Sequence, residues 1–494
     1  MSNSLPQGWS SCTLADIAAV NPKTVADESL IAGFVPMSHA PTSYHGELLF
    51  DEKPWGEIKK SYTNFQDGDV IFAKVTPCFE NGKAAIVDDL PNGIGAGSSE
   101  FYVLRPHCSG ISQKLLFALI KTHAFMQEGA TNMTGAVGLR RVPKSFVETF
   151  PIVLPPAEEQ KEITDRLDTL LAQVEATQAH LARIPDIIKR FRQSVLSVAV
   201  SGKLTDSWQS KNYSYYHQLD TEILESPKLK KYFSLNSDEI NNAKVLLGCT
   251  GLTKWKLYPL EVLIDPERGI SYGIVQTGEP DSDGIPTIRC GDVKHFQVNK
   301  NQLKRVSTEI EAKYSRTRLI GNEVILAIRG SVGNAAVITK KMAESPINIS
   351  REIAMIPVRK NINPHFIALL LQSPGGYRCL AEKTKGVAQK GINIADVKRL
   401  VTPLPPLDEQ TEIVRRVEQL FAYADSIEQQ AKAAKERVDK LTQAILAKAF
   451  RGELTADWRA ANPELISGDN SAAALLARIQ AERAAVKPRK SRRV

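Results

Sequence analysis

Residues of the types that cut phosphodiester bonds occur in one loose, nuclease-like arrangement. Pro280-Asp281 and Glu311-Ala312-Lys313 fit the PD…(D/E)xK pattern, in which two carboxylates and a lysine support Mg²⁺-dependent hydrolysis. The gap between the two parts of this pattern is unrestricted, so many unrelated chains contain it by chance. Pro280-Asp281 also lies in a turn-like EPDSDG stretch. A nuclease built on Asp281, Glu311 and Lys313 is therefore an alternative hypothesis that the pattern alone does not establish.

Other catalytic motifs are incomplete or missing. Gly93-Ile-Gly-Ala-Gly97 resembles part of a nucleotide-binding glycine loop, but it does not link a clear strand to a helix, which favours a flexible loop. The sequence contains neither a GxxxxGK(S/T) phosphate loop nor the Asn/Asp-Pro-Pro-Tyr/Phe motif of amino-methyltransferases. Its eight histidines show no metal-ligand spacing. We therefore expect a binding and assembly protein without catalytic residues or a metal site.

The composition limits the class of protein and its partners. The chain has 494 residues, a formal net charge of +8 and a pI of about 9.0, which suits a polyanionic partner. No apolar run reaches the roughly 18 residues that a membrane span needs, and the N-terminus lacks the apolar segment of a signal peptide. The six scattered cysteines favour free thiols in a reducing compartment. We expect a cytoplasmic protein with no membrane contact.

The elements that must position any site belong to an internal repeat. Residues 154–208 and 404–458 align without a gap, 250 positions apart, and seventeen of the 55 pairs are identical. Both copies begin with Pro-Pro followed by acidic residues and end near a glycine, Gly202 or Gly452, as helices often do. Chance does not give a gapless match of this length, so the chain contains two copies of one unit.

Each copy predicts one long helix with an apolar seam, because apolar residues recur at alternating spacings of three and four. The seam positions include Ile163, Leu167, Leu170, Leu181 and Phe191 in the first copy, and Ile413, Val417, Leu420, Val438 and Leu441 in the second. Pro185 is expected to kink or break the first helix. Neither helix can leave its stripe in water, so we expect the two to pair antiparallel within the chain.

About 150 residues of β-rich texture precede each helix, with short strands expected at residues 68–73, 84–87, 101–104, 322–328, 335–338 and 352–356. The predicted fold class is α+β: two β-rich α/β domains separated by a pair of long antiparallel coiled-coil helices, with an internal pseudo-two-fold repeat. The expected organisation is a first domain at 1–153, a helix at 154–208, a linker at 209–250, a second domain at 251–403, a helix at 404–458, and a tail at 459–494 with a short helix and a basic end.

The repeated segments carry a family resemblance. LPPAEEQKEI…RFRQSVL…GKLTDSW and LPPLDEQTEIVRRVEQLF…LTQAILAKAFRGELTADW resemble the two conserved regions of the specificity subunit of type I restriction–modification enzymes, and the second is most similar to the type IA subclass. The resemblance covers the plan of the whole chain, whereas the variable domains match only through isolated anchors. It implies that each variable domain is a target recognition domain that reads one half of a bipartite, asymmetric double-stranded DNA site.

The resemblance also implies what the rest of the complex does. The helices would set the distance between the half-sites and dock two methyltransferase (modification) subunits, which supply S-adenosylmethionine and adenine methylation. Separate ATP- and Mg²⁺-dependent restriction subunits would supply DNA cleavage. This chain would then be a non-enzymatic subunit of a restriction system that holds no cofactor.

Candidate DNA-binding residues lie in loops at matching places in the two variable domains, where basic groups can meet phosphates and planar donors can meet base edges. They are Lys74, Thr76, Arg140 and Arg141 in the first domain, and Arg329, Ser331, Gln389 and Lys390 in the second. A protein-binding antiparallel scaffold without DNA readout is the other alternative.

Overall fold

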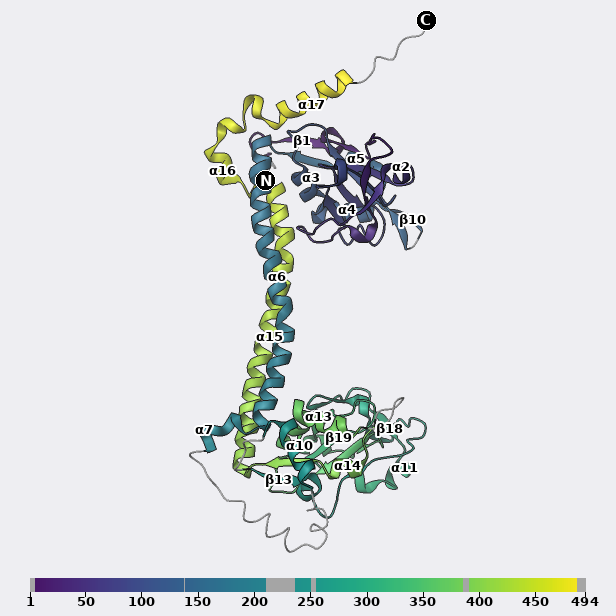
Figure 1. The fold of residues 1–494 in the computed structure, drawn as a ribbon, viewed down its shortest axis with the longest axis vertical. Helices are drawn as coiled ribbons and strands as arrows, with labels where there is room; N and C mark the ends of the chain where they lie inside the picture. The colour runs from purple at the N-terminus through teal and green to yellow at the C-terminus, as the bar shows by residue number, and fades with distance from the viewer. Residues whose placement is uncertain (1–4, 137, 210–235, 250–254, 385–390, 487–494) are drawn as a thin grey trace. The chain divides into compact units, whose positions relative to one another are not determined.

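The computed structural model describes residues 5–136, 138–209, 236–249, 255–384 and 391–486. Two compact units divide the chain. The first contains residues 1–182 and 432–494, and the second contains residues 183–431. Each unit holds one globular domain and one part of each long helix (Figure 1). No helix among the described residues is long and apolar enough to cross a membrane.

The globular domain of the first unit contains two four-stranded sheets. The antiparallel sheet has the order β2 (Ala18–Val20), β9 (Phe101–Pro106), β6 (Val70–Ala73) and β7 (Ala84–Ile86). The mixed sheet has the order β4 (Asp51–Pro54), β3 (Ile31–Val35), β8 (Ile94–Gly97) and β5 (Thr63–Gln66), with β3 and β8 parallel. The helices are α1 (Leu14–Ile17), α2 (Trp55–Ile58), α3 (Gln113–Ile120), α4 (His123–Thr131) and α5 (Lys144–Thr149). An antiparallel ribbon of β1 (Ser10–Thr13) and β12 (Pro151–Leu154) leads into the first long helix.

The globular domain of the second unit repeats this plan. Its larger sheet has the order β14 (Ser271–Tyr272), β22 (Ile353–Pro357), β19 (Glu323–Ala327) and β20 (Ala335–Val337). The smaller sheet has the order β18 (Lys304–Val306), β15 (Ile285–Ile288) and β21 (Asn348–Ile349), and β16 (Val293–Lys294) pairs with β17 (Gln297–Val298). The helices are α10 (Ser237–Leu247), α11 (Thr308–Ala312), α12 (Pro364–Gln372), α13 (Pro374–Glu382) and α14 (Ile394–Lys398). The ribbon of β13 (Lys256–Pro259) and β23 (Val401–Leu404) corresponds to β1 and β12.

The predicted strands are confirmed, and one predicted loop is wrong. The six expected segments overlap β6, β7, β9, β19, β20 and β22. Their short apolar runs are buried on both faces; every residue of β19 is buried, for example. The run Gly93-Ile-Gly-Ala-Gly97 was expected to be a flexible loop, yet it forms strand β8. A Cβ atom on Gly95 would lie 2.5 Å from the Phe65 ring, so glycine permits close packing there.

The two long helices are α6 (Ala157–Val200) and α15 (Leu407–Phe450), and they run antiparallel in each unit. Gln178 donates to Asp439 in the first unit, and Arg192 contacts Asp425 in the second, so residue numbers rise along one helix as they fall along the other. Figure 1 shows the two helices side by side within each unit. Gly202 and Gly452 follow the helices with φ of +77° and +72°, a conformation that glycine adopts without steric cost.

Most of the predicted seam is buried or half-buried, and one position, Leu441, needs correction. Ile163, Leu167, Ile413 and Val417 are buried, and Leu181, Phe191, Leu420 and Val438 are half-buried. Leu170 is only half-buried, whereas its neighbour Leu171 is 1% exposed. Leu441 is 45% exposed, and Thr442 beside it is half-buried. Leu441 lies three residues after Val438, and Thr442 lies four residues after it. A helix with 3.6 residues per turn allows either step, so spacing alone does not decide which of the two faces the other helix.

Pro185 does not break α6, contrary to expectation, because the helix is uninterrupted from Ala157 to Val200. The proline is exposed, whereas Ile188, one turn later, is 5% exposed. A proline on the solvent side removes one backbone hydrogen bond and leaves the packed face intact. The apolar stripe therefore continues past it.

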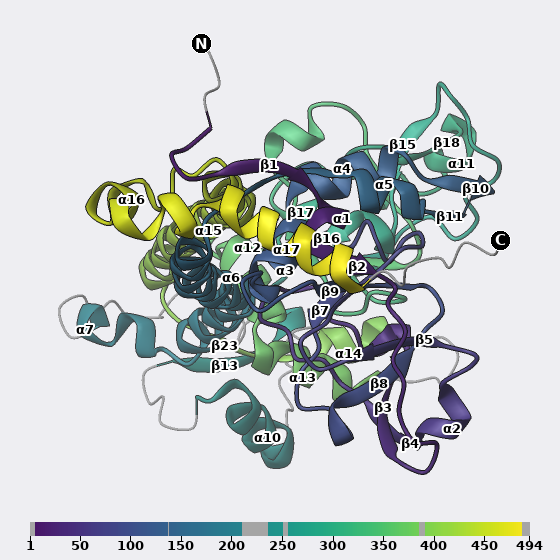
Figure 2. The same ribbon diagram turned by 90° about the horizontal axis from the view of Figure 1, so that it is seen from above.

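A buried carboxylate closes the helical pair in the first unit. Glu159, at the start of α6, is fully buried and accepts hydrogen bonds from the Trp9 indole (2.8 Å), the Thr455 hydroxyl (2.7 Å) and Arg459 (2.7 Å). Trp9 precedes β1, and Thr455 follows α15. This contact therefore joins the globular domain, the start of α6 and the end of α15. The tail adds α16 (Ala456–Ala461) and α17 (Ala472–Val486), and α17 packs against α1 (Figure 2).

The second unit contains the same junction, with the roles of the two copies exchanged. Glu409, at the start of α15, accepts hydrogen bonds from the Trp255 indole (3.1 Å) and the Thr205 hydroxyl (2.7 Å). Thr205 follows α6 and precedes α7 (Asp206–Gln209). The repeat found in the sequence is therefore also a repeat of contacts, in which the end of each long helix meets the start of the other.

Candidate nucleic-acid interface

Four predicted residues of the first domain come together on two adjoining loops. The loop after β6 meets the hairpin of β10 (Thr134–Ala136) and β11 (Leu139–Arg141). The Thr76 amide donates to the Arg140 carbonyl (3.0 Å), the Arg140 amide donates to the Thr76 hydroxyl (2.8 Å), and Val142 donates to the Lys74 carbonyl (2.8 Å). These residues lie more than 60 positions apart in sequence, so the tertiary fold brings them together.

The charged groups of this cluster have different partners. The Lys74 ammonium donates to the Ser99 carbonyl (2.7 Å) and lies 5.3 Å from the centre of the Tyr102 ring. The Arg141 guanidinium donates to both oxygens of Glu100 (2.9 and 2.7 Å) and lowers the pKa of that carboxyl. Arg140 is exposed, and its distance to Glu80 is 3.5 Å. Arg140 is thus freer than Arg141 to meet an external anion.

The second domain places its candidates in the same frame. Arg329 and Ser331 are exposed in the loop after β19. Arg329 forms an antiparallel bridge with Gly391, and the corresponding bridge in the first domain joins Val75 and Arg141. The Ile392 amide donates to the Ile328 carbonyl (2.9 Å), and the corresponding bond in the first domain runs from Val142 to Lys74. Gln389 and Lys390 lie outside the described residues. The backbone links around the two loops are therefore equivalent, whereas the side chains differ.

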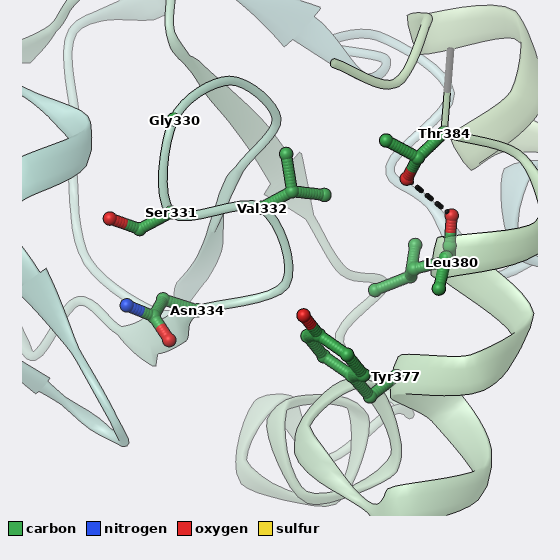
Figure 3. A pocket seen from close by; sticks show the side chains of 8 residues that line it. Gly330, Ser331, Val332, Asn334, Tyr377, Leu380 and Thr384 are labelled. Atoms are coloured by element: carbon green, nitrogen blue, oxygen red, sulfur yellow. Dashed lines mark hydrogen bonds between the residues drawn. The ribbon is translucent and has the colours of Figure 1, made fainter. Parts of the chain in front are cut away.

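A pocket of about 480 Å³ adjoins the loop of the second domain (Figure 3). It is lined by residues 330–332 and 334 of the loop and by Tyr377, Leu380, Ala381 and Thr384. Helix α13 positions Tyr377: the buried hydroxyl of Ser373 caps its first turn by accepting from the Gly376 amide (3.0 Å), and Pro374 follows as the first helical residue. Sequence reasoning missed Tyr377, because nothing in its local pattern separates an exposed tyrosine from a packing residue.

The nuclease-like residues do not form a metal site. The Glu311 carboxylate is buried and accepts hydrogen bonds from Arg318 and Asn348. The hydrogen bond from Arg318 lowers the pKa of Glu311. Asp281 lies in a turn and accepts a hydrogen bond from the Asp283 amide (3.0 Å), and Lys313 is exposed. Across the described ranges, no group of three or more His, Cys, Asp or Glu side chains could hold a metal ion.

Comparison with known proteins identifies relatives over most of the chain. The family described as the type I restriction modification DNA specificity domain matches residues 6–186 and 280–436. The EcoBI specificity subunit of Escherichia coli is 43% identical over 361 residues, which are 73% of this chain and 70% of that protein. The EcoKI specificity subunit of Escherichia coli strain K12 is 35% identical over 401 residues, 79% of this chain and 76% of that protein.

A solved structure shares the fold. The HsdS subunit from Thermoanaerobacter tengcongensis has a TM-score of 0.60 and 20% identity, over 91% of this chain and 98% of that one. The family match covers the first globular domain, most of the second and the N-terminal part of both long helices, including the junction carboxylates Glu159 and Glu409. By sequence, and in agreement with its fold, the chain belongs to the family of type I restriction–modification specificity subunits.

Proposed function

We propose that the chain reads a bipartite, asymmetric site in double-stranded DNA, with one half-site for each globular domain. The observation that carries this proposal is that equivalent backbone contacts hold the loop after β6 and the loop after β19, whereas the two loops carry different side chains. We call this set of backbone contacts the frame of each loop. Lys74, Thr76 and Arg140 occupy the first frame, and Arg329 and Ser331 occupy the second. Two similar frames with different base-edge donors read two different sequences, whereas identical readers would require a palindrome.

The candidate residues have distinct roles in this proposal. Arg140 and Arg329, both exposed, meet phosphates or guanine edges, and Lys74 and Lys390 add positive charge. Thr76, Ser331 and Gln389 supply uncharged hydrogen-bonding groups. Arg141 keeps its bond with Glu100 and holds the hairpin in place, unless a phosphate replaces that carboxylate.

The long helices set the spacing between the half-sites and dock two methyltransferase subunits. Support for docking comes from large apolar side chains exposed on these helices: Ile187 is 59%, Tyr423 is 64% and Leu441 is 45% exposed. Aromatic side chains such as Tyr423 are enriched at interfaces between proteins relative to the rest of the surface. The chain itself is non-catalytic and holds no cofactor; S-adenosylmethionine acts in the methyltransferase subunits, and ATP and Mg²⁺ act in restriction subunits of the same cytoplasmic complex.

The test is a map of methylated adenines in DNA from cells that express this chain with its operon partners. We expect one asymmetric consensus with two defined halves and a fixed spacer. Binding of the purified complex to that site should weaken steeply as salt rises, because phosphate contacts release counterions. A protein-binding scaffold without DNA readout would give no consensus and no salt-dependent DNA binding. Cleavage of plasmid by the chain alone with Mg²⁺ would support the nuclease hypothesis instead.

A further inference from the structure

The pocket beside the loop after β19 differs from the corresponding place in the first domain. In the first domain, the loop aromatic Phe79 packs onto Gly129 of α4: a Cβ atom on that glycine would lie 2.4 Å from the Phe79 ring. Phe79 is 3% exposed, so this aromatic fills the space between loop and helix.

In the second domain the partners are exchanged. The aromatic residue, Tyr377, comes from helix α13, and the glycine, Gly333, comes from the loop; a Cβ atom on Gly333 would lie 2.8 Å from the Tyr377 ring. Tyr377 is 55% exposed, and its hydroxyl makes no hydrogen bond within the described part of the chain. Figure 3 shows this hydroxyl turned toward the loop, with Val332 facing Leu380 beside it. The exchange therefore leaves an open pocket with a free hydroxyl.

The lining identifies the kind of group that fits. A volume of about 480 Å³ lies within the range of roughly 300–1,000 Å³ that is typical of ligand sites. None of the described lining residues is charged, which disfavours a phosphate and suits an uncharged group. The walls combine a hydroxyl donor, on Tyr377, with branched aliphatic side chains, on Val332 and Leu380. In the major groove, only thymine presents a hydrogen-bond acceptor, O4, beside a methyl group.

We propose that this pocket reads one thymine of the second half-site. The Tyr377 hydroxyl donates to thymine O4, and the C5 methyl group packs between Val332 and Leu380. Tyr377 is then a specificity-determining residue of the second domain. This inference rests on the proposed function, since it assigns a base to a domain that is proposed to read DNA.

The experiment uses the complete complex with its methyltransferase partners and a randomised DNA library. For the wild-type chain, the second half of the consensus should contain at least one A·T pair besides the pair that holds the methylated adenine. Replacing the thymine of that pair by uracil removes only the methyl group and should weaken binding about fourfold, the loss expected for one buried methyl. Replacing it by 5-methylcytosine keeps the methyl group, loses the O4 acceptor, and should weaken binding about three- to tenfold.

Substitutions assign these losses to the pocket. In Tyr377→Phe, which keeps the ring, the 5-methylcytosine penalty should disappear and the uracil penalty should remain. In Val332→Ala the pattern should be the reverse. Tyr62→Phe, a matched change at a half-exposed tyrosine of the first domain, should alter neither half of the consensus. Circular dichroism and retained selection of the first half-site would show that each variant is folded.

Two kinds of failure remain distinguishable. A second half-site with no A·T pair besides the methylated one, or a Tyr377→Phe variant with unchanged selection at every position, would overturn the thymine pocket while leaving the DNA-reading function intact. A wild-type complex that selects no consensus in either half would overturn the proposed function itself.

Discussion

The Thr455 hydroxyl donates a hydrogen bond to Oε1 of Glu159 across 2.7 Å, linking the segment after α15 to the first turn of α6. The equivalent threonine, Thr205, donates to Glu409 at the same distance. Nearby, Arg166 and Arg416 donate to the carbonyls of Leu454 and Leu204 at 2.8 and 2.7 Å. Each junction therefore combines residues from both sequence copies. The glutamate at the start of each long helix is bound by the threonine that follows the other long helix, so each copy depends on the other for these hydrogen bonds.

Loss of the Glu159 charge should destabilise the first unit. Glu159→Gln keeps the shape of the side chain but leaves Arg459, which is 13% exposed, without its carboxylate. Breaking a buried ion pair in this way typically costs about 3–5 kcal/mol in the free energy of unfolding. Urea unfolding measures the loss. Glu158→Gln, at the exposed neighbouring position, is the control and should cost less than about 1 kcal/mol. Equal losses in the two variants would contradict a buried junction.

The seam makes a paired prediction at adjacent leucines. Leu171→Ala should lower the free energy of unfolding by about 2–5 kcal/mol, because Leu171 is 1% exposed within the core that includes Ile163 and Leu167. Leu170→Ala should cost less, because Leu170 is only half-buried. Thermal or urea unfolding of the two variants compares them. A larger loss at Leu170 would restore the seam expected from the 3-4 spacing alone.

A buried lysine predicts a pH-dependent term in the stability of the first unit. The Lys121 ammonium donates to the carbonyls of Thr42 (2.9 Å) and Gly82 (2.6 Å), and burial lowers its pKa from 10.5 to about 8. The pKa of Lys121 is lower in the folded protein than in the unfolded protein, so protonation of Lys121 opposes folding. The contribution of Lys121 to the free energy of unfolding is therefore fully present above the unfolded pKa and is lost as the pH falls through 8.

The wild-type protein should therefore gain up to about 3 kcal/mol over Lys121→Met between pH 8 and 10.5. Urea unfolding at several pH values within this window measures the difference. Lys144→Met, at an exposed lysine, is the control and should differ from the wild type by less than about 1 kcal/mol throughout this range. A constant difference for Lys121→Met would mean that Lys121 titrates normally in the folded protein.

Exchange of the first domain should change one half of the DNA site. Replacing residues 1–153 with the first domain of another family member brings new side chains into the frame of Lys74, Thr76 and Arg140. We expect a new first half-site, an unchanged second half-site and an unchanged spacer, as measured by mapping methylated adenines. A change in both halves would show that the two domains do not read independently.

Lengthening both helices should lengthen the spacer. Seven residues inserted after Ala182 and seven after Ala431 add about 10.5 Å of helix at 1.5 Å per residue, which corresponds to about three base pairs at 3.4 Å each. Replacing seven residues at the same places without changing the length is the matched control. An unaltered spacer in the lengthened protein would remove the helices as the ruler.

Sequence reasoning found the repeat, the strands and the helix ends, because each depends on local chemistry. Apolar runs predicted β6 and β19, and Pro-Pro before acidic residues predicted the starts of α6 and α15. The errors came where two local patterns were equally good. Leu441 and Thr442 both fit the spacing, and only the facing helix decides which of them is more buried. Pro185 predicted a break, but the packed face opposite the proline continues the helix.

The sequence by itself determined that this chain is a duplicated frame with two dissimilar domains, because a gapless repeat and its spacing are visible without any contact. Only the tertiary structure decided which side chains face outward at the loops. Arg140 and Arg141 are adjacent and chemically identical, yet Glu100 accepts hydrogen bonds from Arg141 at 2.9 and 2.7 Å, whereas Arg140 lies 3.5 Å from Glu80. The loop supplies the aromatic residue Phe79 in the first domain and helix α13 supplies Tyr377 in the second, and each faces a glycine from a distant part of the chain. Pairings between residues remote in sequence follow from packing in three dimensions, and no local pattern encodes them.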